Sequence, residues 1–578
     1  MSMTITLHDA IKTFTDDQDK IIRPEETVRR FKNKLAELDL DILEATQRID
    51  SGRLGIPVYF SRCGKDARRI IGTRKQMGKG ATPQQAEASA VMELAERFSF
   101  FAFTKDPARF ITATAASLGE TALPFHFIAQ SVHDTTADLA AAQRIYEALP
   151  MKWTQAFNLT RGHATLVPFD WFFAINQFNG PSAGNCQEEA ISQGICEIVE
   201  RHVSALVSRG RLDVPAIDPA GVSDPAVKEM LGKYSANGIR LFISDFSLGT
   251  GIPTVGVMAY DPSTFPGKSE IIWTAGTTPD PEKALSRTLT EVAQLAGDFN
   301  TGSNFVASGL PKFGSLEEAA YITNPSRVVG IKDLPDISDD NIRVEIERAV
   351  AALADRGMDV LLIDTRHPRL DVPAFYTIVP GAHFRERAAG TSVGMFAAKH
   401  ITESLAPRQA LARLTAVDAE LPGKYYVKFY MGQSLIAAGA PDKALTLLTE
   451  AARLDPPDQE AASIYAYTGV ALKALERYEA ALEALSRAER LDAERTDVHN
   501  LKGFCYFKLK AHEKAIESFK KVIALDPSSA IDYANIASNY RDLGDREKAI
   551  QFYETALALD PGIGFALTNL MALRKKNA

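Results

Sequence analysis

The sequence predicts an α/β domain with mixed sheets, followed by an all-α helical solenoid. Three observations carry this prediction. Up to about residue 400, apolar strand-like runs alternate with helix-like segments, whereas the rest of the chain repeats itself with a period of about 34 residues. The first part also contains an internal duplication, in which a glycine turn opens a helix that ends in Glu-x-x-Glu-Arg. We expect one domain over residues 1–410 and a second over residues 411–578.

The first part of the chain opens with an amphipathic helix that runs into a strand within residues 24–48. Pro24 lies near its start and acidic residues fill its first turn, as is typical of a helix N-terminus. The next elements that we expect are a short apolar strand over 56–61, a solvated loop and hairpin over the basic run 65–79, a mixed, largely helical segment over 104–155 and a buried strand over 167–173, with sequence VPFDWFF.

After residue 201 strand and helix patterns alternate. The helix expected over 282–296 carries Arg287, Glu291 and Gln294 at i, i+4 and i+7, hence on one face. Taken alone, this spacing predicts an ion pair between Arg287 and Glu291. If a phosphate lies beside the helix, the Arg287 guanidinium would instead bind that phosphate. The other elements that we expect are strands over 239–244, 253–260, 271–277, 359–364 and 372–381, a helix over 343–355 and a long loop, mobile or a substrate lid, over 297–314.

The duplicated motif is the strongest chemical signal. In both copies the first Glu lies 13 residues after a glycine, Gly80 in one and Gly184 in the other. Helical spacing places the two carboxylates of a copy side by side, with the Arg beside the first of them. The acids are Glu93 and Glu96, followed by Arg97, in the first copy, and Glu197 and Glu200, followed by Arg201, in the second.

A lone motif of this kind is most simply a solvated salt-bridge face. Here apolar residues surround the acids in both copies, which indicates buried helices. Adjacent buried carboxylates repel each other, so they must take up protons or meet cations. Four of them suggest a divalent metal, and hard oxygen ligands favour Mg²⁺, which shares its shell with nucleotide phosphates. The glycine turns supply backbone N–H groups for phosphates, and Lys79 adds a positive charge at the first turn.

The motifs GKGAT…AxASAxxExxER and SAGN…EAxxxGxxExxER, with RTLTEVAQ after them, resemble the YcaO family over roughly the first 400 residues. The resemblance implies an ATP-dependent enzyme that activates a peptide backbone amide. It implies that Mg²⁺ is bound by Glu93, Glu96, Glu197 and Glu200. The implied ATP contacts are Ser89, Asn185, Glu189, Arg201, Arg287 and Gln294, with Lys79, and with Lys20 and Thr27 as the N-terminal lysine and hydroxyl residue. Thr27 is alternatively a helix cap.

The resemblance leaves two classes of function open. In an enzyme, ATP phosphorylates the amide oxygen and a nucleophile then adds to the amide carbon: a substrate Cys, Ser or Thr gives an azoline, and external sulfide gives a thioamide. We expect thioamidation, because azoline-forming members commonly finish in Pro-x-Pro-x-Pro and this chain finishes ALRKKNA. In the alternative, the protein is an ATP-binding accessory factor of a ribosomal-protein methylthiotransferase. Substrate-dependent ATP turnover distinguishes the two classes.

The second part of the chain carries the tetratricopeptide signature. Leucines near the repeat ends, at 454, 491, 525 and 559, are spaced by 37, 34 and 34 residues, and small residues recur at the expected helix crossings. We expect four helix pairs and a capping helix, Gly564 to Lys575, in a solenoid with a concave face. This module is either a packing or dimerising extension or a groove for a partner. The partners that we expect are a peptide or protein substrate, a sulfur-donor or TfuA-type protein, and a second copy in a homodimer.

Composition excludes several other classes. The chain has 46% hydrophobic residues, a net charge of −8 and a pI near 5.8, so we expect neither nucleic-acid nor membrane binding. It has no signal-peptide pattern or membrane span, and we expect a cytoplasmic location. The four cysteines form no Cys-x-x-Cys pair, so disulfides and structural zinc are not expected. Cys186, inside the second motif, is either a nucleophile or an ordinary helix position, and we assign it no role.

Overall fold

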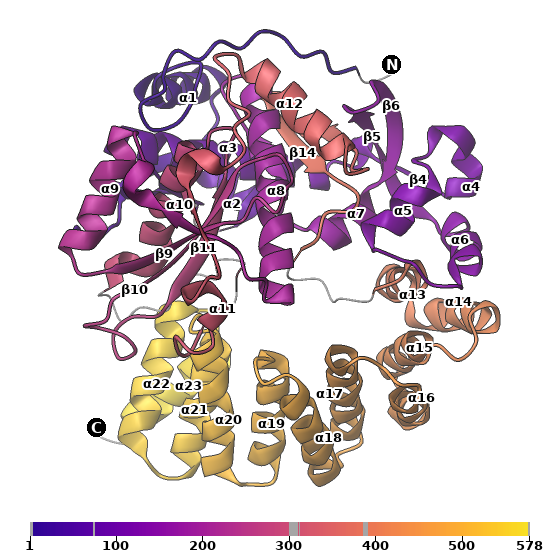
Figure 1. The fold of residues 1–578 in the computed structure, drawn as a ribbon. Coiled ribbons are helices and arrows are strands. Elements are labelled where there is room, and N and C mark those ends of the chain that lie inside the picture. Colours follow the sequence, from indigo (N-terminus) through magenta and orange to yellow (C-terminus); the bar gives the residue numbers. More distant parts are fainter. Residues whose placement is uncertain (1–3, 73–75, 300–309, 311–312, 385–390, 576–578) are drawn as a thin grey trace. The chain divides into compact units, whose positions relative to one another are not determined.

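The computed structural model describes residues 4–72, 76–299, 310, 313–384 and 391–575 (Figure 1). The chain forms two compact units, each treated by itself below. The first unit comprises residues 1–134 and 150–390, and the second comprises residues 135–149 and 391–578. Within the described residues, no helix combines the length and apolar character that a bilayer crossing requires.

Within the residues that the structure describes, the first unit has the predicted α/β fold with three sheets, of which the five-stranded one is mixed. The strand orders are β1-β2-β3, β11-β10-β9-β8-β12 and β4-β5-β13-β14-β7, with β6 paired to β5. The described pairs are antiparallel except for the parallel pair β12–β8. The strands are β1 Leu43–Arg48, β2 Val58–Cys63, β3 Gln76–Lys79, β4 Ile111–Ala113, β5 Met151–Asn158, β6 His163–Pro168, β7 Pro181–Ala183, β8 Ala216–Asp218, β9 Arg240–Asp245, β10 Thr254–Tyr260, β11 Ile272–Thr277, β12 Val328–Gly330, β13 Leu361–Asp364 and β14 Ala374–Ile378.

Both copies of the duplicated motif lie on long helices. Their close packing on the sheets requires glycine. A Cβ on Gly78 of β3 would lie 2.0 Å from the backbone N of Ala90 on the first motif helix, and one on Gly194 of the second would lie 2.3 Å from Thr377 Oγ1 of β14. The helices of this unit are α1 Pro24–Leu38, α2 Lys65–Ile71, α3 Pro83–Lys105, α4 Ala115–Leu118, α5 Phe125–Ser131, α7 Phe169–Asn176, α8 Gln187–Gly210, α9 Pro225–Ala236, α10 Pro281–Ala296, α11 Ala320–Thr323 and α12 Ile342–Ala354.

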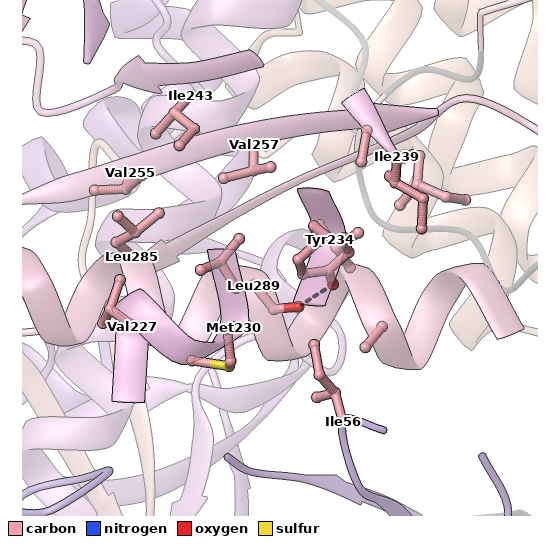
Figure 2. Packing of buried hydrophobic residues seen from close by; sticks show 14 of the residues in the cluster. Ile56, Val227, Met230, Tyr234, Ile239, Ile243, Val255, Val257, Leu285 and Leu289 are labelled. Atoms are coloured by element: carbon pink, nitrogen blue, oxygen red, sulfur yellow. Dashed lines mark hydrogen bonds between the residues drawn. The ribbon is translucent and has the colours of Figure 1, made fainter. Parts of the chain in front are cut away.

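The five-stranded sheet and two helices enclose one hydrophobic core of the first unit (Figure 2). Val255 and Val257 of β10 and Leu285 and Leu289 of α10 are fully buried. Tyr234 of α9 is also buried, and its hydroxyl donates a 2.7 Å hydrogen bond to the carbonyl of Leu289. Each such buried aliphatic side chain contributes roughly 1.5–3 kcal/mol of hydrophobic stabilisation. This packing fixes α10, one of the helices that carry the predicted site.

Two expectations for local structure are wrong. The strand expected over 167–173 ends at Pro168, and α7 begins at the next residue, because Trp171, Phe172 and Ile175 bury one helical face. The basic run 65–79 contains the helix α2 before β3 rather than a loop and hairpin, with Ala67 and Ile71 buried beneath its basic face. The segment 104–155 is mixed and helical as predicted, with β4 and the start of β5 besides its helices. Most of the loop expected over 297–314 lies outside the described residues.

The second unit is a helical repeat, as predicted. Four helix pairs, α15–α16 to α21–α22, are followed by α23, and the alanines at the predicted crossings, 444, 481, 515 and 549, are fully buried. A Cβ on Gly469 would lie 2.6 Å from Leu485, so glycine lets this pair approach closely. The helices are α6 Leu139–Glu147, α13 Val393–Ser404, α14 Pro407–Glu420, α15 Tyr425–Ala437, α16 Pro441–Arg453, α17 Asp458–Ala474, α18 Tyr478–Leu491, α19 Thr496–Lys508, α20 His512–Leu525, α21 Ala530–Asp542, α22 Arg546–Leu559 and α23 Gly564–Lys575.

Candidate nucleotide and metal site

One pocket of about 260 Å³ in the first unit is bordered by α3, α8, α10, β3 and the segment that precedes α1. The structure brings all of the predicted site residues together in its lining. They are Lys20, Thr27, Lys79, Ser89, Glu93, Glu96, Asn185, Glu189, Glu197, Glu200, Arg201, Arg287 and Gln294. The helices therefore present these side chains on the faces that the motif spacing predicts. The ligand role of each residue stays a prediction.

The four motif carboxylates share the pocket with two motif arginines. Arg97 Nε lies 3.4 Å from Glu96 Oε1 and 3.8 Å from Glu93 Oε1. In the second copy, Arg201 Nη2 lies 3.8 Å from Glu200 Oε1 and 4.0 Å from Glu197 Oε1. These are long ion pairs, and so they neutralise the carboxylates incompletely.

Backbone donors fix one carboxylate of each copy. Met77 N–H donates to Glu93 Oε2 at 3.2 Å, and Gly180 N–H donates to Glu197 Oε2 at 3.2 Å. Burial raises the pKa of Glu93 and of Glu197, and it raises the pKa of Glu96 well above its ordinary value. When these three carboxylates are ionised, they need a further cation close by.

The helix α10 brings its own charges to the pocket. Arg287 Nε lies 3.4 Å from Glu200 Oε2, and its Nη1 donates to Gln193 Oε1 at 3.4 Å. One turn later, Glu291 forms an ion pair with Lys79 of β3. Burial, together with the Arg287 guanidinium, lowers the pKa of Lys79 to about 7. The carboxylates of Glu200 and Glu93 act on this pKa in the opposite direction by favouring the ammonium form.

Residues from the N-terminal segment close another wall. Thr27 lies inside α1, whose N-cap is Arg23, so the cap interpretation of Thr27 is wrong. The Thr27 hydroxyl hydrogen-bonds instead to Asn185 Oδ1 at 3.0 Å. Asn185 donates from its backbone N at 2.9 Å and from Nδ2 at 2.8 Å to Glu189 Oε2. This network joins α1 to the second glycine turn.

Several pocket residues were missed by the sequence reasoning. Gln18, Gln85 and Gln193 are uncharged, so no titratable pattern marks them, although all three amides lie at the pocket wall. The sequence reasoning named Arg97 and Glu291 in their motifs but gave them no site role, and both line the pocket. The repeated Glu-x-x-Glu-Arg pattern could have identified Arg97, since its equivalent Arg201 was included.

The carboxylate oxygens of the pocket fit a metal ion that keeps part of its coordination shell for water and phosphate oxygens. Among the described residues, no three His, Cys, Asp or Glu side chains converge into a complete metal site. Incompletely neutralised carboxylates on two facing helices nevertheless suit Mg²⁺, which takes one or two carboxylates together with phosphate oxygens. Lys20, Lys79, Arg201 and Arg287 offer cationic partners for a polyphosphate in the same pocket.

Cys186 lies at the start of the helix that carries the second motif copy. It is the N-cap of α8, and its sulfur accepts a 3.4 Å hydrogen bond from the backbone N of Glu189. Burial raises the pKa of its thiol to about 12. The cysteine is therefore the cap that precedes α8 rather than a position inside the helix, and it helps to form the second glycine turn.

Residues 77–383 match the family model described as YcaO cyclodehydratase, ATP- and Mg²⁺-binding. This match covers more than half of the 578 residues. Residues 496–529 and 533–563 match tetratricopeptide repeat models. The matches agree with the division into a pocket-bearing α/β unit and a repeat unit.

Three relatives are similar to the first part of the chain. An uncharacterized protein of Methanothermobacter thermautotrophicus is 28% identical over 62% of this chain and 94% of its own length. An uncharacterized protein in the tfuA 3′ region of Rhizobium leguminosarum bv. trifolii is 24% identical over 64% and 89%. The ribosomal protein S12 methylthiotransferase accessory factor YcaO of Escherichia coli is 28% identical over 50% of each chain.

A solved structure shares the fold. YcaO from Methanopyrus kandleri, bound with AMPPCP and Mg²⁺, superimposes with a TM-score of 0.50 at 22% identity, over 65% of this chain and 95% of that one. At this identity the likeness concerns the fold of the first part of the chain.

Proposed function

This chain belongs to the YcaO cyclodehydratase family, and on that premise we propose that it uses ATP and Mg²⁺ to activate a backbone amide of a peptide or protein. The observation that carries the proposal is the pocket itself. It gathers the carboxylates of both motif copies and the cations of α8, α10 and β3 at one place. Such a pocket suits phosphoryl transfer, in which positioning and charge neutralisation supply most of the catalysis.

We assign Glu93, Glu96, Glu197 and Glu200 to Mg²⁺, which when bound would neutralise charge on the transferred phosphoryl group. Arg201 and Arg287 would contact the triphosphate, and Lys20 and Thr27 would hold the rest of the nucleotide. The ion pair with Glu291 keeps Lys79 oriented at the first glycine turn. No nucleophile of the protein is needed in this reaction class, since the nucleophile adds to the amide carbon of the substrate.

For the second substrate we propose external sulfide, which converts the amide to a thioamide. We also propose that a sulfur-donor or TfuA-type protein supplies the sulfide; the likeness to a protein encoded beside tfuA supports this partner.

The test is ATP hydrolysis by the purified protein with sulfide and cell-extract peptides, followed by mass spectrometry of the peptides. Oxygen-to-sulfur exchange adds roughly 16 Da, whereas dehydration removes roughly 18 Da, so one spectrum distinguishes the two reactions of the ATP-driven step. Glu197→Ala is the matched inactive variant. Peptide-stimulated turnover that survives in this variant would contradict the assigned site.

A second function is favoured by the repeat unit. The tetratricopeptide matches are typical of protein-binding modules, and the Escherichia coli relative is named an accessory factor of a methylthiotransferase. In that case nucleotide binding regulates recruitment of a partner through the repeats. Tight Mg·ATP binding without any peptide-stimulated turnover, with sulfide present, would support this function over amide activation.

A further inference from the structure

The residues before α1 form an arm, defined as residues 4–23, with no helix or strand of its own. It nevertheless forms part of the pocket wall through Gln18, Lys20 and Ile22. Few of its side chains are buried and apolar, namely Ile5, Ala10 and Phe14. Burial of these three side chains alone therefore stabilises the arm too little. It does not offset the conformational entropy that a segment without regular secondary structure loses when it is held in one conformation.

Polar contacts hold the arm, and Lys12 is at their centre. Lys12 Nζ lies 2.7 Å from Asp19 Oδ2 of the arm and 2.5 Å from Glu345 Oε1 of α12. The side chains of Lys12 and Glu345 are only 5% and 3% exposed. One buried cation therefore joins two carboxylates, one from the arm and one from the folded unit.

This contact reaches the pocket through Lys20. Asp19 directly precedes Lys20, and Phe14 and Lys20 exchange backbone hydrogen bonds of 3.1 and 2.9 Å. On the other side of Lys20, Ile21 N–H donates to Glu189 Oε1 at 2.8 Å. Lys20 is thus held between the Lys12 contact and a residue of the second motif.

Four further hydrogen bonds tie the arm to the first glycine turn and to α10. Asp17 is buried, and it accepts hydrogen bonds from the backbone N of Ala81 at 2.7 Å and from Ser286 Oγ at 3.1 Å. Lys283 of α10 donates to the carbonyls of Thr15 and Asp16. These bonds fix the arm at the level of the pocket, and the ion pairs of Lys12 add a link from Asp19 of the arm to Glu345 of α12.

We propose that Lys12 is a positioning residue for the nucleotide: its buried contact with Asp19 and Glu345 holds the arm so that Lys20 and Gln18 face the pocket. The inference rests on the proposed function, since it concerns the same site. Lys12 itself is absent from the pocket lining, so its effect is exerted on nucleotide affinity through the arm.

The test is the dissociation constant of Mg²⁺ and a non-hydrolysable ATP analogue, with KM and kcat for ATP measured on the same variants. Lys12→Met should raise Kd and KM about tenfold, as about 1.4 kcal/mol of lost binding would, while kcat at saturating ATP changes little. Amide exchange within residues 12–22 should accelerate. Lys12→Arg should restore affinity, because it keeps the charge between the two carboxylates.

Lys428→Met is the matched control, because Lys428 also joins two carboxylates, Asp418 at 2.8 Å and Glu450 at 3.2 Å, but belongs to the repeat unit. It should leave Kd unchanged. A folded Lys12→Met variant with wild-type Kd and arm exchange would overturn the inference. If Lys12→Met does not fold, Asp19→Asn provides the test, and an unchanged Kd in that variant overturns the inference equally. Failure of the wild-type protein to bind the analogue would instead refute the proposed function.

Discussion

Lys79 of β3 and Glu291 of α10 form an ion pair across the pocket, although more than 200 residues separate them in the chain. We predict that Glu291→Gln lowers kcat/KM for ATP about tenfold, because loss of this charged partner removes about 1–2 kcal/mol of stabilisation from the ammonium that faces the phosphates. Steady-state ATP hydrolysis checks this. Glu229→Gln, which breaks the exposed pair of Glu229 with Lys233 on α9, should have no effect. Equal kinetics in both variants would show that the ion pair between Lys79 and Glu291 is not needed for ATP turnover.

Glu93→Gln and Glu197→Gln separate stability from metal binding. The pKa of each carboxyl is raised by burial, so ionisation in the folded state costs free energy and the cost grows as pH rises through the raised pKa. A neutral amide removes this cost. We predict that both variants have an unchanged or higher Tm at pH 8 without Mg²⁺, but lose the increase in Tm that Mg·ATP gives the parent protein. Differential scanning calorimetry measures both quantities, and a retained Mg·ATP shift would refute the metal assignment.

The duplicated motif allowed the site to be predicted from sequence because its information is local. Helical spacing alone places Glu93 beside Glu96 and Glu197 beside Glu200, and buried apolar residues flank both pairs. The fold of the second unit could be predicted from the repeat period for a similar reason, since each helix pair packs on its sequence neighbours.

Other features depend on tertiary contacts that no local pattern contains. The arm has no periodicity, so neither Gln18 nor the Lys12 contact with Glu345 could be inferred. The segment FDWFF has the aromatic composition of a strand, yet it forms α7, because Trp171 and Ile175, four residues apart, are both buried in the helical conformation. Here tertiary burial outweighs intrinsic preference.

Three histidines from separate segments predict a loss of stability in acid. The rings of His133 and His383 stack at 3.7 Å, and the His383 backbone N–H donates to His202 Nδ1 at 3.0 Å. Burial lowers the pKa of His202 and of His383 to about 4, and the neighbouring imidazoles and the guanidinium groups of Arg209 and Arg356 act in the same direction. The unfolded chain therefore binds more protons between about pH 6.5 and pH 4, and stability falls as pH decreases through this range.

We expect the Tm to decrease from pH 6.5 to pH 4, and His202→Asn to flatten this decrease, because Asn keeps an acceptor for the His383 N–H but takes up no proton. Thermal unfolding at several pH values measures the decrease in Tm for the parent protein and for His202→Asn. His163→Asn, at an exposed position of β6, is the control and should keep the parent slope. A slope unaffected by His202→Asn would mean that other groups cause the acid sensitivity.

Gly78→Ala probes the contact between β3 and α3 that positions Lys79. The added Cβ would lie 2.0 Å from the backbone N of Ala90 and 2.2 Å from the carbonyl O of Ala86, and a helix backbone cannot yield as a flexible side chain does. We predict a loss of about 1–3 kcal/mol in the free energy of unfolding, together with weaker nucleotide binding, since β3 must move away from α3. Urea unfolding measures the first quantity. Gly232→Ala on α9 is the matched control: nothing lies within 4 Å of its added Cβ, so the change should be neutral or stabilise by about 0.5–1 kcal/mol. Equal stability of the two variants would show that the contact is not needed.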